Sequence, residues 1–399
     1  MTSIRTLTVI LACLVMLGPF ATDAYLPSFV SIGQEFEASQ SMVQQTLSVY
    51  LIGFAVMSLF WGTLSDSFGR RPIILVSLAI FAVGSIGSAL APSFGWLLFF
   101  RAVQGCSAGA GRVVGQALVR DHFHGADAQR LFANITMVFS LAPAIAPVIG
   151  GYLNNHAGWR STFTLLTILT ALLIVVCWRS LPESLVPEAR QPFRLGAILR
   201  NYLHALRNLQ FLLAILGVGF AFAGFSLYIA SAASFIMGIL KLPETAFGWL
   251  FIPFISGMIC GSMLNSKLAG KVRATPMIRA GMMVMTLGAL LNVFYNVFWQ
   301  AAIPWAVLPI FVYALGMSMI LPNMTIMVLN IYPHMRGLAS SLQSTAQMTI
   351  FASVSGLVAP MLFHSALLLA LGMLGSAVLC ITLWTASRHL AHRQGMAKA

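Results

Sequence analysis

Long apolar runs, separated by polar, Gly or Pro residues, dominate this sequence and constrain its fold more than any other feature. A helix needs about 20 apolar residues to cross the hydrocarbon core of a membrane, and these runs lack the apolar–polar alternation of a membrane β-barrel. The pattern therefore predicts an all-α polytopic membrane protein with twelve transmembrane helices. The predicted spans are 7–29, 42–63, 72–91, 96–119, 131–153, 160–180, 209–236, 245–266, 276–298, 302–326, 337–361 and 365–386.

Composition excludes several classes of protein. Hydrophobic residues make up 59% of the 399 residues and charged residues only 8%, whereas about 25% of an ordinary soluble domain is charged. A soluble chain of this size would lack the polar groups that its surface needs. The sequence is therefore not that of a soluble enzyme, a disordered protein or a nucleic-acid-binding protein, although a net charge of +13 would suggest the last in a soluble chain.

The basic residues are distributed unevenly about the predicted spans. If the N-terminus and the even-numbered connections share one side, that side holds 18 of the 22 Lys and Arg residues, and the other side holds only Arg160 and Lys241. Basic residues gather in cytoplasmic loops, so we expect a multi-pass protein of the bacterial inner membrane with both termini cytoplasmic. The stretch 7–21 resembles a signal peptide, but no clean cleavage site follows it, and we interpret it as an uncleaved first helix.

One long polar segment, 181–208, divides the chain. It predicts an N-terminal six-helix bundle at 1–180, a cytoplasmic linker at 181–208 and a C-terminal six-helix bundle at 209–399. The linker also suits a short amphipathic helix lying on the membrane. A weak repeat relates Gly62–Asp66 to Gly261–Asn265, 199 residues later. It indicates two pseudo-symmetric halves with a substrate site between them near the midplane.

The loop after span two combines residues suited to a conformational role: Gly62, Asp66, Gly69, Arg70 and Arg71. Gly62 would let two helices approach closely, and Gly69 would allow a tight turn. Asp66 can accept hydrogen bonds from helix N-terminal amides or pair with a nearby arginine. We expect this loop to have a conformational role; the alternative is a simple charged turn.

Span four contains two arginines, Arg101 and Arg112. A charge at this depth costs roughly 2.5 kcal/mol or more, so it normally faces the bundle interior and has a partner; the alternative for Arg101 is that it extends to the outer interface. The two are 11 residues apart, or about 1100° along one helix, so they would share a face. Arg112 would contact an anionic or polar substrate, repel a cation, or bond to carbonyl groups.

Asp23 is the only acidic residue within a predicted span. Burial of an isolated carboxyl group favours its neutral form, whereas a neighbouring arginine favours the charged form. These opposing effects suit a proton carrier, with protonation releasing an ion pair to Arg101. The alternative is an aspartate at the outer interface that caps a helix broken before Pro27.

Span five contains residues that permit bending and close packing: Pro143, Pro147, Gly150 and Gly151. Several aromatic or polar residues within the spans are candidates for substrate binding, although ordinary packing is the alternative for each. They are Tyr25, Tyr50, Gln104, Phe222, Tyr228, Asn323, Gln343 and Gln347.

Three kinds of site are not expected. The five cysteines each lie within an apolar run and form no CxxC pair, so we expect neither disulfides nor a cysteine metal site. No HExxH spacing is present, and no metal site is expected. No phosphate-binding Walker loop occurs, so ATP would not drive transport directly.

These motifs resemble those of the major facilitator superfamily over essentially the whole chain. Segment 62–71 resembles its signature loop between helices two and three, 101–108 its fourth-helix motif and 133–151 its antiporter motif. Segment 23–27 is similar to the first-helix motif of drug-exporting proton antiporters, and 333–342 to the bicyclomycin/chloramphenicol resistance (Bcr/CflA) group. In the antiporter motif the family has Gly where this chain has Ala133, Ala142 and Ala146.

The resemblance implies the major facilitator fold, with two six-helix bundles, and a proton-coupled multidrug or antibiotic efflux antiporter working by alternating access. It implies that Asp23 and Arg101 couple proton transfer and that the 62–71 loop latches the halves on the cytoplasmic side. The energy source would be the proton gradient, with no cofactor. We expect a monomer in the lipid bilayer that binds protons and a small-molecule substrate but no nucleic acid.

Other functions stay open at this point. A proton-coupled transporter of a physiological metabolite, such as a nucleoside or an amino acid, would have the same motifs. An intramembrane enzyme would need paired catalytic groups at matching depth, and only Asp23 is available, so we do not expect an enzyme. A sensor that transports nothing is a further alternative.

Overall fold

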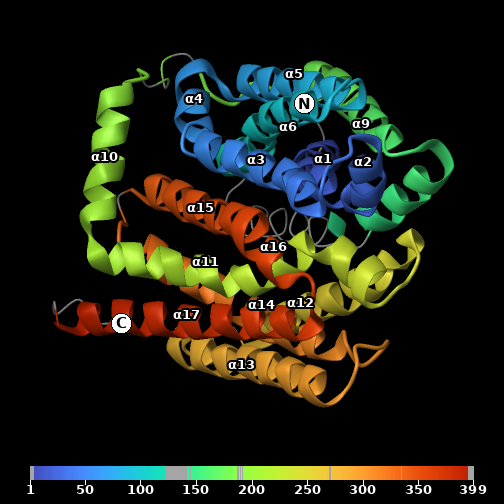
Figure 1. Ribbon diagram of the computed structural model, residues 1–399. Coiled ribbons are helices and arrows are strands. Elements are labelled where there is room, and N and C mark those ends of the chain that lie inside the picture. Colours follow the sequence, from blue (N-terminus) through green and yellow to red (C-terminus); the bar gives the residue numbers. More distant parts are fainter. Residues whose placement is uncertain are drawn as a thin grey trace. The chain divides into compact units, whose positions relative to one another are not determined.

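The computed structural model describes residues 4–122, 142–143, 145–186, 188, 190, 192–268, 271–333 and 335–393. In this part of the chain every regular element is a helix. The chain forms two compact units, Met1–Phe193 and Arg194–Ala399, which we call unit 1 and unit 2. Their division lies inside the segment 181–208. Figure 1 shows the helices of both units in sequence colours.

Unit 1 is a bundle of helices. Its elements are α1 (Ile4–Asp23), a 3-10 turn (Leu26–Ser28), α2 (Phe29–Glu35), α3 (Gln40–Ser58), α4 (Trp61–Phe68), α5 (Arg70–Ala89), α6 (Phe94–Ala108), α7 (Ala110–His122), a helical segment at 145–157, and α9 (Arg160–Ser180). Within it, α6 packs against α3 and α5, while α9 packs against α5 and α1.

Unit 2 is a second bundle. Its elements are α10 (Leu195–Arg207), α11 (Leu209–Ala230), a π-helical turn (Ser234–Ile239), a 3-10 turn (Glu244–Phe247), α12 (Gly248–Leu268), α13 (Ala274–Phe298), α14 (Leu308–Leu329), α15 (Arg336–Ser353), a π-helical turn (Val354–Val358), α16 (Ala359–Leu362) and α17 (Ala366–Arg393). In this unit α14 packs against α12 and α13, and α11 packs against α15 and α17.

The predicted membrane spans correspond well to the helices. The described residues contain nine helical segments long and apolar enough to cross a membrane, or ten if α3 and α4, bent by 47°, count as one span. The predicted span 96–119 corresponds to the pair α6 and α7, and the predicted span 131–153 lies partly outside the described residues. The all-α, multi-pass character of the chain is therefore confirmed.

The first spanning helix of each unit is the most buried of the described spans. Within their most apolar stretch, the spans that contain α1 and α11 are each 72% buried, against 28–50% for the other spans in the described part of the chain. Most of the other helices expose a large apolar face, as expected where lipid replaces water as the solvent. Groups on α1 and α11 therefore lie at the centre of their units.

Three predicted spans contain breaks in their α-helix. The first ends its α-helix at Asp23, the second breaks between α3 and α4, and the fourth breaks at Gly109. The tenth begins later than predicted, because residues 303–307 form turns around Pro304 before α14 starts at Leu308.

Candidate functional site

Asp23 ends α1 at the point where the first span breaks. The chain continues into the 3-10 turn because Pro27 has no amide hydrogen to extend the helix. The Asp23 residue is only 2% exposed, and its Oδ1 atom accepts a hydrogen bond from the Thr22 hydroxyl at 3.0 Å. Among the described residues there are three ion pairs, and Asp23 is in none of them. Its carboxyl group is therefore buried without a cation at ion-pairing distance in this part of the chain.

Arg101 on α6 is fully buried and has a different set of partners from the one expected. Its Nη1 atom donates to the Ala21 carbonyl oxygen at 3.2 Å and to Gln104 Oε1, and its Nε atom donates to the Thr46 carbonyl oxygen at 3.4 Å. No ion pair to Asp23 is formed among the described contacts. The predicted interior position is correct, but the predicted ion pair is wrong, because Nε and Nη1 donate to backbone and amide oxygens instead. The Nη2 atom is buried without a hydrogen-bond partner among the described residues.

Two tyrosines enclose the Arg101 guanidinium. Its central carbon lies 4.2 Å from the ring centroid of Tyr25 and 4.3 Å from that of Tyr50, an arrangement that contributes about 2 kcal/mol when desolvated. The Tyr25 hydroxyl lies 3.0 Å from Thr46 Oγ1, and the Tyr50 hydroxyl donates to the Gly18 carbonyl oxygen at 3.1 Å. Both substrate-binding candidates are therefore held inside unit 1 in this conformation.

Gln104 extends this buried network to a further helix. Its Nε2 atom donates to Ser85 Oγ on α5 at 2.8 Å. Through Arg101 and Gln104, polar contacts therefore join α1, α3, α5 and α6. We call the set Tyr25, Thr46, Tyr50, Arg101 and Gln104 the arginine cluster. Thr46 and Ser85 were missed because a single hydroxyl in an apolar run has no distinctive sequence pattern.

Close backbone contacts fix the helices around this cluster. A Cβ atom at Gly150 would lie 1.6 Å from the Ala24 carbonyl oxygen, and one at Gly105 would lie 2.0 Å from the Tyr50 carbonyl oxygen. The helix at 145–157 therefore meets the chain directly after Asp23. Gly62 was expected to be such a contact, but a Cβ there would meet Val113 at an ordinary 3.6 Å.

The rest of the predicted span-five motif is only partly described. Pro143 is partly buried, while Pro147 and Gly151 are buried within helical backbone. Ala133 lies outside the described residues.

Arg112 lies on α7 and is partly buried. Its predicted common face with Arg101 assumed one continuous helix, whereas the helix is interrupted at Gly109 between α6 and α7. The two arginines also differ in burial, because Arg101 has no exposed surface. The continuous helix on which the predicted shared face depended is therefore interrupted.

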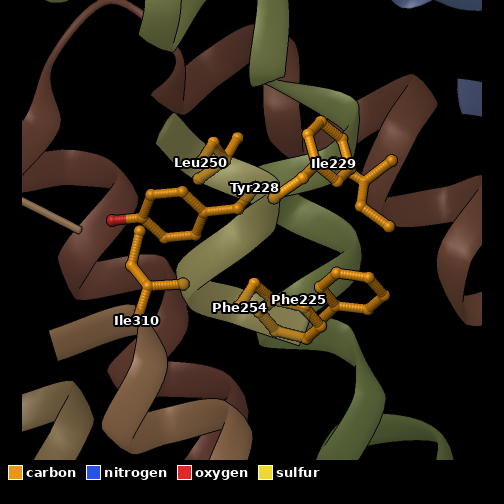
Figure 2. Close-up of a pocket in the computed structure, with 7 residues that line it drawn as sticks. Phe225, Tyr228, Ile229, Leu250, Phe254 and Ile310 are labelled. Atoms are coloured by element: carbon orange, nitrogen blue, oxygen red, sulfur yellow. The ribbon is translucent and has the colours of Figure 1, made fainter. Parts of the chain in front are cut away.

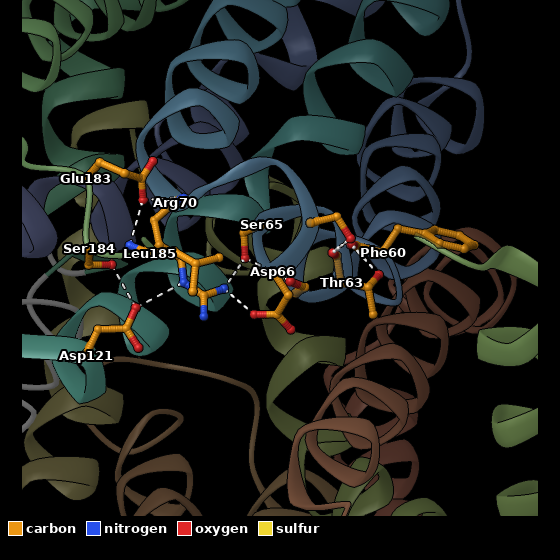
Figure 3. Close-up of polar contacts among 11 residues, drawn as sticks. Phe60, Thr63, Ser65, Asp66, Arg70, Asp121, Glu183, Ser184 and Leu185 are labelled. Atoms are coloured by element: carbon orange, nitrogen blue, oxygen red, sulfur yellow. Dashed lines mark hydrogen bonds and ion pairs between the residues drawn. The ribbon is translucent and has the colours of Figure 1, made fainter. Parts of the chain in front are cut away.

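The 62–71 loop forms a charge network at one end of unit 1 (Figure 3). Arg70 Nη1 pairs with Asp66 Oδ1 at 2.5 Å and donates to Ser65 Oγ at 2.7 Å. Arg70 Nε pairs with Asp121 Oδ2 at 3.1 Å, and Ser184 Oγ donates to the same oxygen at 2.7 Å. One arginine thus links the loop to the end of α7 and to the chain that follows α9.

Glu183 caps the N-terminus of α5. Gly69 adopts a φ of +101° between α4 and α5, a conformation that favours glycine. This turn presents two amides to Glu183, whose Oε1 accepts from the Arg70 amide at 3.0 Å and whose Oε2 accepts from the Arg71 amide at 3.2 Å. Asp66 therefore pairs with an arginine, and the capping role falls to Glu183, which sequence reasoning missed.

A third ion pair, elsewhere in unit 1, involves Glu35 and Arg160. Arg160 Nη1 lies 2.5 Å from Glu35 Oε1, and Trp159 Nε1 donates to Glu35 Oε2 at 2.6 Å. Arg160 Nη2 also donates to the Ala91 carbonyl oxygen at 3.1 Å. The pair therefore joins the end of α2 to the start of α9 and to the turn after α5.

Unit 2 contains a small aromatic cavity (Figure 2). Its volume is about 10 Å³, far below the roughly 300 Å³ or more of a ligand pocket, so it holds no drug-sized molecule in this conformation. The rings of Phe225 and Phe254 stack with centroids 3.7 Å apart. The lining residues are Phe225, Tyr228, Ile229, Leu250, Phe251, Phe254 and Ile310.

Tyr228 gives this cavity a polar end. Its hydroxyl accepts a hydrogen bond from Asn292 Nδ2 on α13 at 2.7 Å. Phe222, about one helical turn before Phe225, lies edge-on to Phe225 and to Phe351 of α15. The candidates Phe222 and Tyr228 thus belong to one aromatic group, whereas Asn292 was not predicted.

The other unit 2 candidates do not join this group in the described contacts. Asn323 Nδ2 donates to Asn265 Oδ1 at 2.7 Å, and Gln343 Nε2 donates to Thr325 Oγ1 at 2.8 Å. Gln347 is partly exposed on α15. Asn323 and Gln343 therefore belong to two separate polar contacts.

Known proteins resemble this chain in sequence and in fold. A bicyclomycin resistance protein homolog from Haemophilus influenzae is 32% identical over 361 residues, 89% of each chain. The multidrug transporter MdfA of Yersinia pestis is 27% identical over 83% of this chain and 81% of its own. The xylose transporter XylE from E. coli, in a partially occluded inward-open conformation, has a TM-score of 0.74 at 16% identity and covers 96% of this chain and 97% of its own.

The family model of the Major Facilitator Superfamily matches residues 11–355. This range includes α1 with Asp23, the arginine cluster, the charge network around Arg70 and the aromatic cavity. The fold of this family has twelve helices in two bundles, consistent with units 1 and 2. Its members are transporters rather than enzymes. The chain belongs to the Major Facilitator Superfamily and is a multi-pass membrane transporter.

Proposed function

We propose that this protein is a proton-coupled multidrug or antibiotic efflux antiporter of the bacterial inner membrane. The observation that carries the proposal is Asp23, a buried carboxyl group on the central helix of unit 1 with no cation at ion-pairing distance among the described residues. A buried carboxyl group favours its neutral form when water is excluded and its charged form when water reaches it. The names of the relatives, bicyclomycin resistance and multidrug transport, support the substrate class.

In the proposed cycle, a conformation open to the outside lets Asp23 take up a proton. The neutral carboxyl group is then stable in a closed site, and the protein changes to a conformation that is open to the cytoplasm. There, entry of water and substrate favours release of the proton. For the substrate, Phe222, Tyr228 and the neutral polar residues of unit 2 offer an apolar, adaptable surface.

Arg101 has a positioning role in this mechanism. It bonds the Ala21 carbonyl oxygen two residues before Asp23 and holds Tyr25 two residues after it. It therefore fixes the broken end of α1, where the proton carrier lies. Its positive charge would also favour the ionised carboxylate whenever the break opens and the two groups approach each other.

The proton gradient would supply the energy, with no cofactor. A membrane potential provides about 2.3 kcal/mol per charge per 100 mV, or about a fifty-fold concentration ratio. We also propose that both termini are cytoplasmic, because 18 basic residues lie on that side. Segment 181–208 would be a cytoplasmic linker between the bundles 1–180 and 209–399. The protein would act as a monomer and bind no nucleic acid.

The decisive test is Asp23→Asn in proteoliposomes with an imposed pH gradient. We expect efflux of a fluorescent lipophilic dye or chloramphenicol against its gradient to be lost, while downhill exchange and the unfolding temperature are retained. Asp23→Glu should keep partial activity, and Glu37→Gln, an exposed carboxyl on the loop after α2, should behave as wild type. Full gradient-driven efflux by Asp23→Asn would overturn the assignment.

The same vesicles test the alternative substrate class. A panel of nucleosides and amino acids can compete for counterflow with the dye. If such a metabolite is exchanged and the drug compounds are not, the protein is a metabolite transporter with the same coupling residue.

A further inference from the structure

The linker helix α10 has an apolar surface that only partly faces the protein. Tyr202 and Ala205 are buried and Ile198 is partly buried where α10 packs on α11 and α15, and the Tyr202 hydroxyl bonds to Ser341 of α15. A second apolar stripe remains outside this contact. Its members are Leu195, Leu199 and Leu203, which are 46%, 43% and 60% exposed.

The spacing makes these leucines a continuous stripe. Residues four apart lie on the same side of a helix, one turn above the other. The stripe is next to the buried face, so the apolar surface of α10 extends beyond the part that the described residues cover. A free face of three leucines in water is unfavourable, since each would gain from burial.

Basic residues border this stripe. Arg200 and Arg207 are exposed and seven residues apart, which is within about 20° of two turns, and Leu203 lies between them in sequence. Arg194 precedes the helix, and no acidic residue occurs within Leu195–Arg207. The uncovered face therefore has an apolar strip with a positive margin.

The position of α10 in the chain puts this face at the membrane surface. The helix ends at Arg207, Asn208 caps the next helix by accepting from the Phe211 amide at 3.2 Å, and the spanning helix α11 begins at Leu209. Figure 1 shows α10 turned sharply away from the direction of α11. A helix joined through one residue to the end of a spanning helix lies at the interface, where leucines reach the acyl boundary and arginines the headgroups.

We propose that α10 binds the bilayer surface through its leucine stripe and recruits anionic phospholipid headgroups through Arg200 and Arg207. The positive margin selects the occupant, because anionic lipid headgroups offer the complementary charge at the same depth. The site would anchor the linker between the two units to the membrane. This inference does not depend on which substrate is transported or on proton coupling.

The test uses the full chain in nanodiscs that hold one copy each. A small fluorescent amino acid is placed at Leu203 or, as the matched control, at Asn201, which is exposed on the opposite side of α10. The lipid is phosphatidylcholine alone or mixed with phosphatidylglycerol, with a quencher on the acyl chains. We expect quenching at Leu203 that rises with the phosphatidylglycerol content, and none at Asn201.

A charge variant separates lipid binding from simple apolar contact. Arg200→Gln/Arg207→Gln should lower the affinity of α10 for membranes that contain phosphatidylglycerol about thirty-fold, or about five-fold for each arginine. Arg273→Gln/Arg279→Gln removes two other exposed charges of unit 2 and should change nothing. The proposal is overturned if Leu203 stays unquenched, if quenching is equal in both lipids and insensitive to the double variant, or if Leu203 is shielded only in discs with two copies.

Discussion

The two units satisfy their polar groups in different ways. Within the described residues, all three ion pairs and the fully buried Arg101 lie in unit 1. Unit 2 instead uses neutral contacts, such as Tyr228 with Asn292 and Tyr313 with Ser376. Among the described residues, charged groups therefore contribute to the side-chain contacts of unit 1, whereas these two contacts of unit 2 are neutral.

The repeated segment shows how the two halves have diverged. Asp66 in unit 1 pairs with Arg70, whereas Asn265 at the matching position accepts a neutral hydrogen bond from Asn323. A Cβ at Gly62 would have room, whereas one at Gly261 would lie 2.3 Å from the Leu315 carbonyl oxygen. Unit 1 is thus joined there by charges, and unit 2 by close backbone contact.

The largest expected contrast is between the two buried polar clusters. Arg101→Met removes donors from the carbonyl oxygens of Ala21 and Thr46 and from Gln104, and we expect the free energy of unfolding to fall by about 3 kcal/mol or more. Tyr228→Phe removes one neutral hydrogen bond and should cost about 1 kcal/mol. Unfolding in detergent measures both, and equal losses would remove the distinction between the units.

A smaller contrast concerns the paired glycines. Gly261→Ala forces α12 away from the backbone of α14 and should cost about 1–3 kcal/mol, while Gly62→Ala should change stability by no more than about 0.5 kcal/mol. The two variants make the same chemical change at repeat-related positions. The comparison would be contradicted if Gly261→Ala left the free energy of unfolding unchanged, or if Gly62→Ala lowered it strongly.

The smallest effect is expected at the cap of α5. Glu183→Gln keeps the hydrogen-bonding shape but removes the negative charge from the helix N-terminus, which should cost about 0.5 kcal/mol at low salt. Added salt should reduce the difference, because the group is exposed. Glu188→Gln, exposed in the same linker, is the control. A loss independent of salt would indicate a packing role.

The spans were predictable because each needs only a long apolar run. Asp23 and Arg101 were also identified correctly as buried, since any charge inside such a run stands out. Their contacts were not predictable: Arg101 bonds to carbonyl oxygens of residues 55 and 80 positions away, and every residue has a carbonyl group.

Only part of the charge network around Arg70 could be predicted, because some of its partners are distant in sequence. Asp66 and Arg70 are four residues apart, so their pairing follows from helical spacing. Asp121 and Glu183 lie 51 and 113 positions from Arg70, and both look like ordinary loop acids. The helix break at Gly109 was missed because nothing in the sequence of the fourth predicted span distinguishes it, whereas a break before Pro27 was one of the two interpretations of Asp23.

The buried guanidinium of Arg101 has a consequence for leakage. It is a permanent positive charge in a poorly screened interior, so a second cation about 8 Å away would meet roughly 2 kcal/mol of repulsion at an effective dielectric constant near 20. Hydronium and sodium ions are repelled by the same field. The arginine that holds the broken end of α1 therefore also raises the electrostatic cost for any free cation that approaches it inside unit 1.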